Sequence, residues 1–89
     1  MSRFARKIDA NQPEIVEALE DAYCEVLSLA PLGNGCADLL VRRCGHKELH
    51  LLEVKGPKGE LTPDQREFHA VWPVTIVRTP EEALRAVGL

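Results

Sequence analysis

The sequence contains no apolar run approaching the roughly 18 residues that a membrane-spanning helix requires. Its basic start, residues 1–7, is followed by no apolar stretch, so it does not have the form of a signal peptide. Cysteine is scarce too, and the odd number and irregular spacing of Cys24, Cys36 and Cys44 argue against a disulfide framework. These absences predict a cytoplasmic protein without a membrane partner.

A basic excess, which is typical of nucleic-acid-binding proteins, is also missing, because the formal net charge is −3. A metal site would concentrate acidic residues in one place, so the total charge does not exclude a DNA-binding protein. The basic residues gather in three groups that could each contact phosphates. These groups are Arg3, Arg6 and Lys7; Arg42, Arg43 and Lys47; and Lys55 and Lys58. The first group lies in a basic N-terminal arm, residues 1–8, which is either a phosphate contact or a solvated terminus.

With 89 residues, the chain is expected to form one domain over 1–89. A chain of this size buries only about 60–70% of the surface that its unfolded form exposes. Its core is therefore thin, and a dimer that shares core residues would stabilise it. The composition, 45% hydrophobic and 28% charged, is that of a globular protein without low-complexity segments.

Turn-forming residues and apolar periodicity divide the chain into seven elements. Asn11, Thr62 and Thr79 suit helix starts, and Gly45-His46 suits a tight type II′ hairpin turn. The expected elements are a helix over 11–23, strands over 25–29, 36–43 and 49–55, a helix over 62–72, a strand over 74–77 and a helix over 79–87. This order predicts an α/β domain in which helices flank a central mixed sheet and a crossover leads to the last strand.

Two acidic residues, Asp38 and Glu53, lie inside apolar strand segments, where an ionised carboxylate is costly unless its charge is compensated. If Gly45-His46 is a two-residue turn, antiparallel pairing places Glu53 opposite Asp38. Facing Cβ atoms lie about 4.5–5.5 Å apart, and like charges at that distance repel. A divalent cation between the carboxylates would remove the repulsion, and oxygen ligands with room for water suit magnesium or manganese.

Lys55 follows Glu53 by two residues, so its side chain is expected on the same face of the strand. An ammonium group beside two carboxylates and a cation can orient an attacking water molecule and stabilise charge that develops on a phosphate. The set of Asp38, Glu53 and Lys55 therefore predicts phosphodiester hydrolysis. The alternative is a cluster of cross-strand salt bridges at a sheet edge, without catalysis.

Asp38 lies in the segment Cys36-Ala37-Asp38-Leu39-Leu40-Val41, and Glu53 and Lys55 lie in Leu52-Glu53-Val54-Lys55-Gly56. A third segment follows over residues 61–69, which open with Leu61-Thr62-Pro63-Asp64-Gln65. Together they resemble the virus-type replication-repair nuclease (VRR-NUC) family, a branch of the PD-(D/E)XK restriction-endonuclease-like superfamily. Residues 74–82 are similar too, and 9–16 resemble small stand-alone members of the phage type. One position departs from the family pattern, because Ala37 stands where a proline usually precedes the motif aspartate.

The resemblance implies a restriction-endonuclease-like fold and a metal-dependent DNA endonuclease in a bacterial or phage-infected host cytosol. It implies that Asp38, Glu53 and the Val54 carbonyl bind Mg²⁺ or Mn²⁺, with no small-molecule cofactor. It further implies a homodimer that cuts branched DNA, such as four-way (Holliday) junctions. The catalytic residues that it implies are Glu14, Asp38, Glu53, Lys55 and Gln65.

Simpler explanations exist for two of these residues. Glu14 would occupy position N3 after Asn11, and Gln65 occupies it after Thr62, so each could serve only to complete a capping box, although Gln65 could serve both purposes. The competing function for the whole chain is a non-catalytic DNA-binding or assembly module on the same fold. A zinc site is not favoured, because no standard spacing or fourth ligand accompanies Cys44, His46 and His50.

Overall fold

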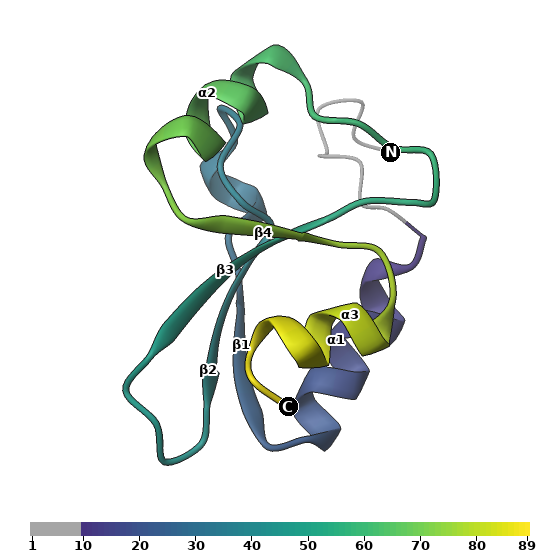
Figure 1. Ribbon diagram of the computed structural model, residues 1–89, viewed down its shortest axis with the longest axis vertical. Coiled ribbons are helices and arrows are strands. Elements are labelled where there is room, and N and C mark those ends of the chain that lie inside the picture. The colour runs from purple at the N-terminus through teal and green to yellow at the C-terminus, as the bar shows by residue number, and fades with distance from the viewer. Residues whose placement is uncertain (1–9) are drawn as a thin grey trace.

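The structure, a computed structural model, describes residues 10–89, and the expected basic arm over 1–8 lies outside the described residues. The expected order of helix, three strands, helix, strand and helix is confirmed (Figure 1). A short 3-10 turn, η1, is the one addition. The elements are α1 (Gln12–Asp21), β1 (Cys24–Ser28), η1 (Ala30–Leu32), β2 (Leu39–Arg43), β3 (Leu49–Val54), α2 (Pro63–Val71), β4 (Val74–Val77) and α3 (Pro80–Ala86).

The four strands form one mixed sheet in the order β1-β2-β3-β4. β1 pairs antiparallel with β2, and β2 pairs antiparallel with β3, whereas β3 and β4 are parallel. The parallel pair is connected through α2, so the expected crossover to the last strand is confirmed. β2 and β3 are the two central strands, so the residues that they carry do not lie at an edge of this sheet.

The register between β2 and β3 is the one that the hairpin pattern predicts. Continued by one residue, this register brings Asp38 opposite Glu53. The observed pairs are Leu39 with Leu52, Leu40 with Leu51, Val41 with His50, and Arg42 with Leu49.

The turn that joins these strands differs from the expected one. The His46 N–H donates to the Arg43 carbonyl at 3.0 Å, so the turn is centred one residue earlier than the predicted pair Gly45-His46. Gly45 is thereby the third residue of the turn and has a φ of 82°, a left-handed conformation that glycine adopts without steric cost. The register is retained because the shift is confined to the loop.

Other predicted boundaries move where the backbone enters the left-handed region. The strand expected over 36–43 begins only at Leu39, after three residues with positive φ. α1 ends before Tyr23, whose φ is 64°, and β1 begins one residue earlier than expected. The three residues with positive φ that precede Cys36 are Gly33, Asn34 and Gly35.

The hydrophobic core lies between one face of the sheet and the pair α1 and α3, which pack against each other (Figure 1). Alternate residues of the strands point to this face, because side chains alternate between faces along a strand. Burying one large aliphatic side chain contributes about 1.5–3 kcal/mol, so this cluster fixes the central strands beneath the helices. The core residues are Ile15, Leu19, Cys24, Leu39, Val41, Leu52, Val54, Val77, Ala83 and Val87.

The opposite face of the sheet carries apolar side chains that the described helices leave exposed. Leu27 is 58% exposed and Leu49 is 61% exposed. Two hollows of about 330 and 320 Å³ lie on this face and share Leu40 and Leu49 in their walls. Trp72, which follows α2, borders the second hollow and is 52% exposed. Within residues 10–89, no helix is both long and apolar enough to cross a bilayer.

Gly35 allows the loop before β2 to approach the start of α2. A Cβ atom at this position would lie 2.5 Å from the backbone carbon and oxygen of Asp64, and the φ of Gly35 is 79°. Both the close approach and the left-handed conformation exclude a larger residue without a shift of the backbone. The contact brings the first turn of α2 to the end of the sheet where Asp38 and Glu53 lie.

We predict that Gly35→Ala lowers the free energy of unfolding by more than about 2 kcal/mol, because left-handed strain and backbone overlap both oppose the new methyl group. Gly45→Ala is the matched control, since Gly45 has a similar φ of 82° but an added Cβ atom would lie within 4 Å of no described residue beyond its two chain neighbours. It should cost only about 1 kcal/mol. Urea unfolding of both variants measures the difference, and equal losses would show that the approach to α2 is not tight.

Candidate active site

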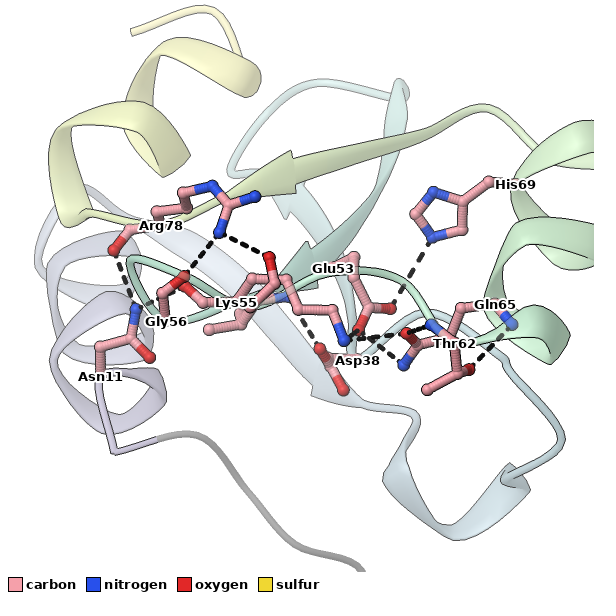
Figure 2. A network of polar contacts seen from close by, with 11 residues as sticks. Asn11, Asp38, Glu53, Lys55, Gly56, Thr62, Gln65, His69 and Arg78 are labelled. Carbon is pink, nitrogen blue, oxygen red and sulfur yellow. Dashed lines mark hydrogen bonds and ion pairs between the residues drawn. The ribbon is translucent and has the colours of Figure 1, made fainter.

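The two acidic residues of the hairpin point to the same face of the sheet, away from α1 and α3. Their neighbours Leu39 and Leu52 are buried in the core, so Asp38 and Glu53 face the other way. Regular pairing stops here. The Asp38 N–H donates to the Leu52 carbonyl at 3.0 Å, and Oδ2 of Asp38 accepts the Val54 N–H at 2.7 Å. A side-chain carboxylate thus takes the place of a strand carbonyl, and the Glu53 side chain lies next to it (Figure 2).

Glu53 is only 1% exposed, although burying an ionised carboxylate costs several kcal/mol when the charge is unpaired. Its Oε2 atom accepts a hydrogen bond from Nε2 of Gln65 at 3.1 Å and lies 3.5 Å from Nζ of Lys55. Its Oε1 atom is buried and has no hydrogen-bond partner. Among the described residues, Oε2 of this carboxyl group therefore has polar partners, whereas Oε1 has no hydrogen-bond partner.

Gln65 joins the start of α2 to the acidic pair. The Thr62 hydroxyl accepts the Gln65 N–H at 3.2 Å, and Oε1 of Gln65 accepts the Thr62 N–H at 2.9 Å, so the predicted capping box is present. The same Oε1 atom accepts a hydrogen bond from Nζ of Lys55 at 2.8 Å. The amide orientation follows from its neighbours, because the ammonium requires an acceptor and the carboxyl group a donor. Helix capping and contact with the site coexist in this one residue.

Lys55 lies on the same face as Glu53, as strand alternation predicts, and its side chain is 12% exposed. Its ammonium group is held between Gln65 and Glu53. Its backbone is fixed as well, since the Lys55 N–H donates to the Val77 carbonyl at 3.1 Å. Because both its ammonium group and its backbone are held, Lys55 can place its positive charge at one defined point of the site.

Asn11 and Arg78 fasten the loop that follows Lys55. Nδ2 of Asn11 donates to the carbonyls of Lys55 and Arg78 at 3.0 and 2.8 Å. Nη1 of Arg78 donates to the carbonyls of Gly56 and Gly59 at 2.5 and 3.0 Å (Figure 2). Sequence reasoning missed both residues, because an asparagine before a helix is typical of an N-cap and the arginine follows a strand without any motif.

Glu14 is not joined to the acidic pair by any contact. It lies exposed in the first turn of α1, and among residues 10–89 it takes part in no hydrogen bond or ion pair. The capping-box explanation is wrong as well, because the Asn11 side chain makes no cap hydrogen bond and binds the loop after Lys55 instead. Its place in the first turn, where an acid favours the helix dipole, is the contribution that the geometry supports.

Burial raises the pKa of Glu53 from 4.5 to about 8. Loss of hydration is the largest cause, and the negative charge of Asp38 and a hydrogen bond to the Asp38 side chain act in the same direction, against Lys55. A pKa of about 8 means that Glu53 is mostly protonated at pH 7 when no cation is bound. This close pairing of two carboxyl groups is what the sequence predicted from the hairpin register.

His69 is a site residue that sequence reasoning missed. Its Nε2 atom lies 3.8 Å from Oε1 of Glu53, and both atoms are buried without a hydrogen-bond partner in the described part of the chain. Burial lowers the pKa of His69, the charge of Lys55 acts in the same direction, and Asp38 acts against them. The spacing of four residues from Gln65 is the signal that could have found it, since such residues share one face of a helix.

No three His, Cys, Asp or Glu side chains within residues 10–89 form a cluster that could hold a metal ion. A cation at the acidic pair would thus be bound by Asp38, Glu53, a backbone carbonyl such as that of Val54, and water, which is a common arrangement for magnesium. Within residues 10–89, no such cluster is formed by the hairpin residues considered for zinc, namely Cys44, His46 and His50.

The chain matches no protein-family model, no curated protein and no solved structure. The functional conclusion therefore depends on the geometry of the acidic pair and on the motifs that carry it.

We predict that the metal-free protein loses stability as the pH rises. The folded-state pKa of Glu53, about 8, exceeds the ordinary value of 4.5, so folding is favoured fully below pH 4.5 and less with each unit up to about 8. The loss amounts to at most about 1.4 kcal/mol per pH unit. Denaturant unfolding in the presence of a chelator measures it, and Glu53→Gln should remove this slope, whereas the exposed control Glu17→Gln should keep it.

Asp38→Asn should act through the same coupling. It removes the charge that raises the pKa of Glu53, and an asparagine oxygen can still accept the Val54 N–H. The metal-free variant should therefore be as stable as the wild type or more stable above pH 7. A loss of several kcal/mol would instead support a structural salt-bridge cluster.

Proposed function

We propose that this chain is a divalent-metal-dependent endonuclease that hydrolyses DNA phosphodiester bonds, of the VRR-NUC type that its motifs resemble. The observation that carries the proposal is a pair of adjacent carboxyl groups beside the ammonium group of Lys55: the buried Glu53 on β3 and the partly buried Asp38, which directly precedes β2. A structural cluster has no need of two acids that would repel each other once both are ionised. We assign the α/β fold, on the same basis, to the restriction-endonuclease-like class.

The residues present fit a magnesium or manganese ion. Among residues 10–89, Oε1 of Glu53 is buried without a hydrogen-bond partner, and burial, with a further contribution from Asp38, raises the pKa of this carboxyl group to about 8. A divalent cation can replace that proton and be held by Asp38, Glu53 and the Val54 carbonyl. When bound, such an ion lowers the pKa of water and screens negative charge on a phosphate.

The side chains around the acidic pair supply orientation and positive charge. Lys55, held by Oε1 of Gln65 at 2.8 Å, can donate to a phosphate oxygen or to the attacking water without having to be ordered first. Gln65 also fixes Oε2 of Glu53 through its amide N–H. We therefore expect the phosphodiester to bind on the sheet face away from α1 and α3, next to the start of α2.

A second copy of this chain is the partner that the uncovered sheet face fits best. An exposed apolar face of this kind marks an interaction surface, and an 89-residue chain has a small core of its own. Two sites related by a twofold axis could make paired cuts in a symmetric branched substrate, such as a four-way junction. We therefore propose a homodimer that acts on branched DNA in the cytosol of a bacterium or a phage-infected host.

We predict that the protein cuts four-way-junction DNA with Mg²⁺ or Mn²⁺ and that a chelator stops cutting. Asp38→Asn and Lys55→Ala should each reduce the rate by about a thousandfold, because each removes charge at the reacting phosphate. The exposed residues Asp21 and Arg85, in the helices on the other face of the sheet, provide the matched controls Asp21→Asn and Arg85→Ala. Flap and linear DNA in the same assay define the preferred substrate.

Cutting that persists in both site variants would remove the assignment of Asp38 and Lys55. Tight, metal-independent binding of DNA without cutting by the wild type would favour the non-catalytic binding module instead.

We predict that the chain sediments as a dimer at micromolar concentration without DNA and that Leu49→Lys shifts it to a monomer. Leu32→Lys is the matched control, because Leu32 is 62% exposed, against 61% for Leu49, but lies in η1 rather than on the sheet face. Analytical ultracentrifugation of the three proteins measures the shift. A wild-type monomer, or a dimer that Leu49→Lys leaves intact, would contradict the proposed surface.

A further inference from the structure

The two oxygens of the Glu53 carboxyl group have different surroundings. Oε2 is contacted by Gln65 and Lys55 at 3.1 and 3.5 Å. Oε1 faces Nε2 of His69 at 3.8 Å, and within residues 10–89 neither of these two atoms has a hydrogen-bond partner (Figure 2). The glutamate side chain is 2% exposed and the histidine side chain 13%, so water has little access to either atom as a hydrogen-bond partner.

The separation of 3.8 Å is too long for a hydrogen bond, whose N···O distance is typically about 2.9 Å. A small rotation of either side chain would close the gap. Leaving a buried acceptor without a donor costs about 1–3 kcal/mol, and more for a charged group. The cost is greatest when Glu53 is ionised, which is its state as a metal ligand.

α2 places both neighbours of the carboxyl group. Gln65 and His69 are four residues apart on this helix, so they lie one turn apart on the same side. The capping box at Thr62 fixes where the helix begins and hence the positions of both side chains relative to Glu53. One helix therefore presents one polar group to each oxygen of the same carboxylate.

We propose that His69 is a positioning residue, which donates its Nε2–H to Oε1 of Glu53 and so orients that carboxylate for the cation. This inference rests on the proposed metal-dependent function. His69 contacts neither the substrate nor the cation in this account. It acts through Glu53, as outer-shell hydrogen bonds to metal-binding carboxylates generally do, and removing such a partner typically weakens metal binding by about 10–100-fold.

The test is calorimetric titration of the full chain with Mn²⁺ and with Mg²⁺, alone and without DNA. His69→Leu should weaken the binding of both ions about 10–100-fold, whereas His69→Gln, whose amide N–H replaces the Nε2–H, should recover most of the affinity. The exposed His46→Leu is the control and should bind like the wild type. Circular dichroism and thermal unfolding establish that each variant is folded.

Three outcomes would overturn the inference. His69→Leu could bind both ions as tightly as the wild type, His69→Gln could bind as weakly as His69→Leu, or His69→Leu could lose Mn²⁺ far more than Mg²⁺, which would make His69 a ligand. The proposed function fails separately, and takes this inference with it, if the wild-type chain binds neither ion.

A second measurement uses the wild-type chain and does not depend on a variant that folds. Long-range proton–nitrogen NMR spectra of the Mg²⁺-bound protein distinguish the two neutral forms of a histidine. The proton of His69 should reside on Nε2, and a proton on Nδ1 alone would overturn the inference, because Nε2 could then not donate to Glu53.

Discussion

The repulsion that arises when the buried Glu53 and the adjacent, partly buried Asp38 are both ionised is the constraint on which the site depends. Asp38 directly precedes β2 and Glu53 lies in β3, the two central strands, and both face the side of the sheet opposite the core helices. Burial, together with the nearby charge of Asp38, raises the pKa of Glu53 to about 8, so a proton remains in the site where a divalent cation would remove the conflict. The fold thus stores an unfavourable arrangement that a cation, rather than the protein, is suited to relieve.

Much of the remaining structure keeps this arrangement from relaxing. Gly35 lets the loop before β2 approach α2, and the capping box sets Gln65 against both Glu53 and Lys55. On the other side, Asn11 and Arg78 bind the carbonyls of the loop after Lys55. Side chains from both ends of the chain therefore converge on one hairpin, and this explains why so small a domain can hold two acids and a lysine in place.

The sequence predicted the parts of this design that depend on local rules. Strand alternation placed Glu53 and Lys55 on one face, hairpin pairing gave the register, and helix-start chemistry located Gln65. The turn was misplaced by one residue, because a glycine can serve at either position and only the tertiary structure decides. Asn11 and His69 were missed for a related reason: their partners lie 44 and 16 residues away, and no periodicity within a single element encodes such contacts.

The most direct test of the account is a diffraction experiment on crystals soaked with manganese, in which anomalous scattering locates the ion. The account predicts a peak in contact with carboxylate oxygens of both Asp38 and Glu53, on the face of the sheet away from α1 and α3. Saturating manganese that leaves this position without a peak, or that places the ion elsewhere on the chain, would contradict the account.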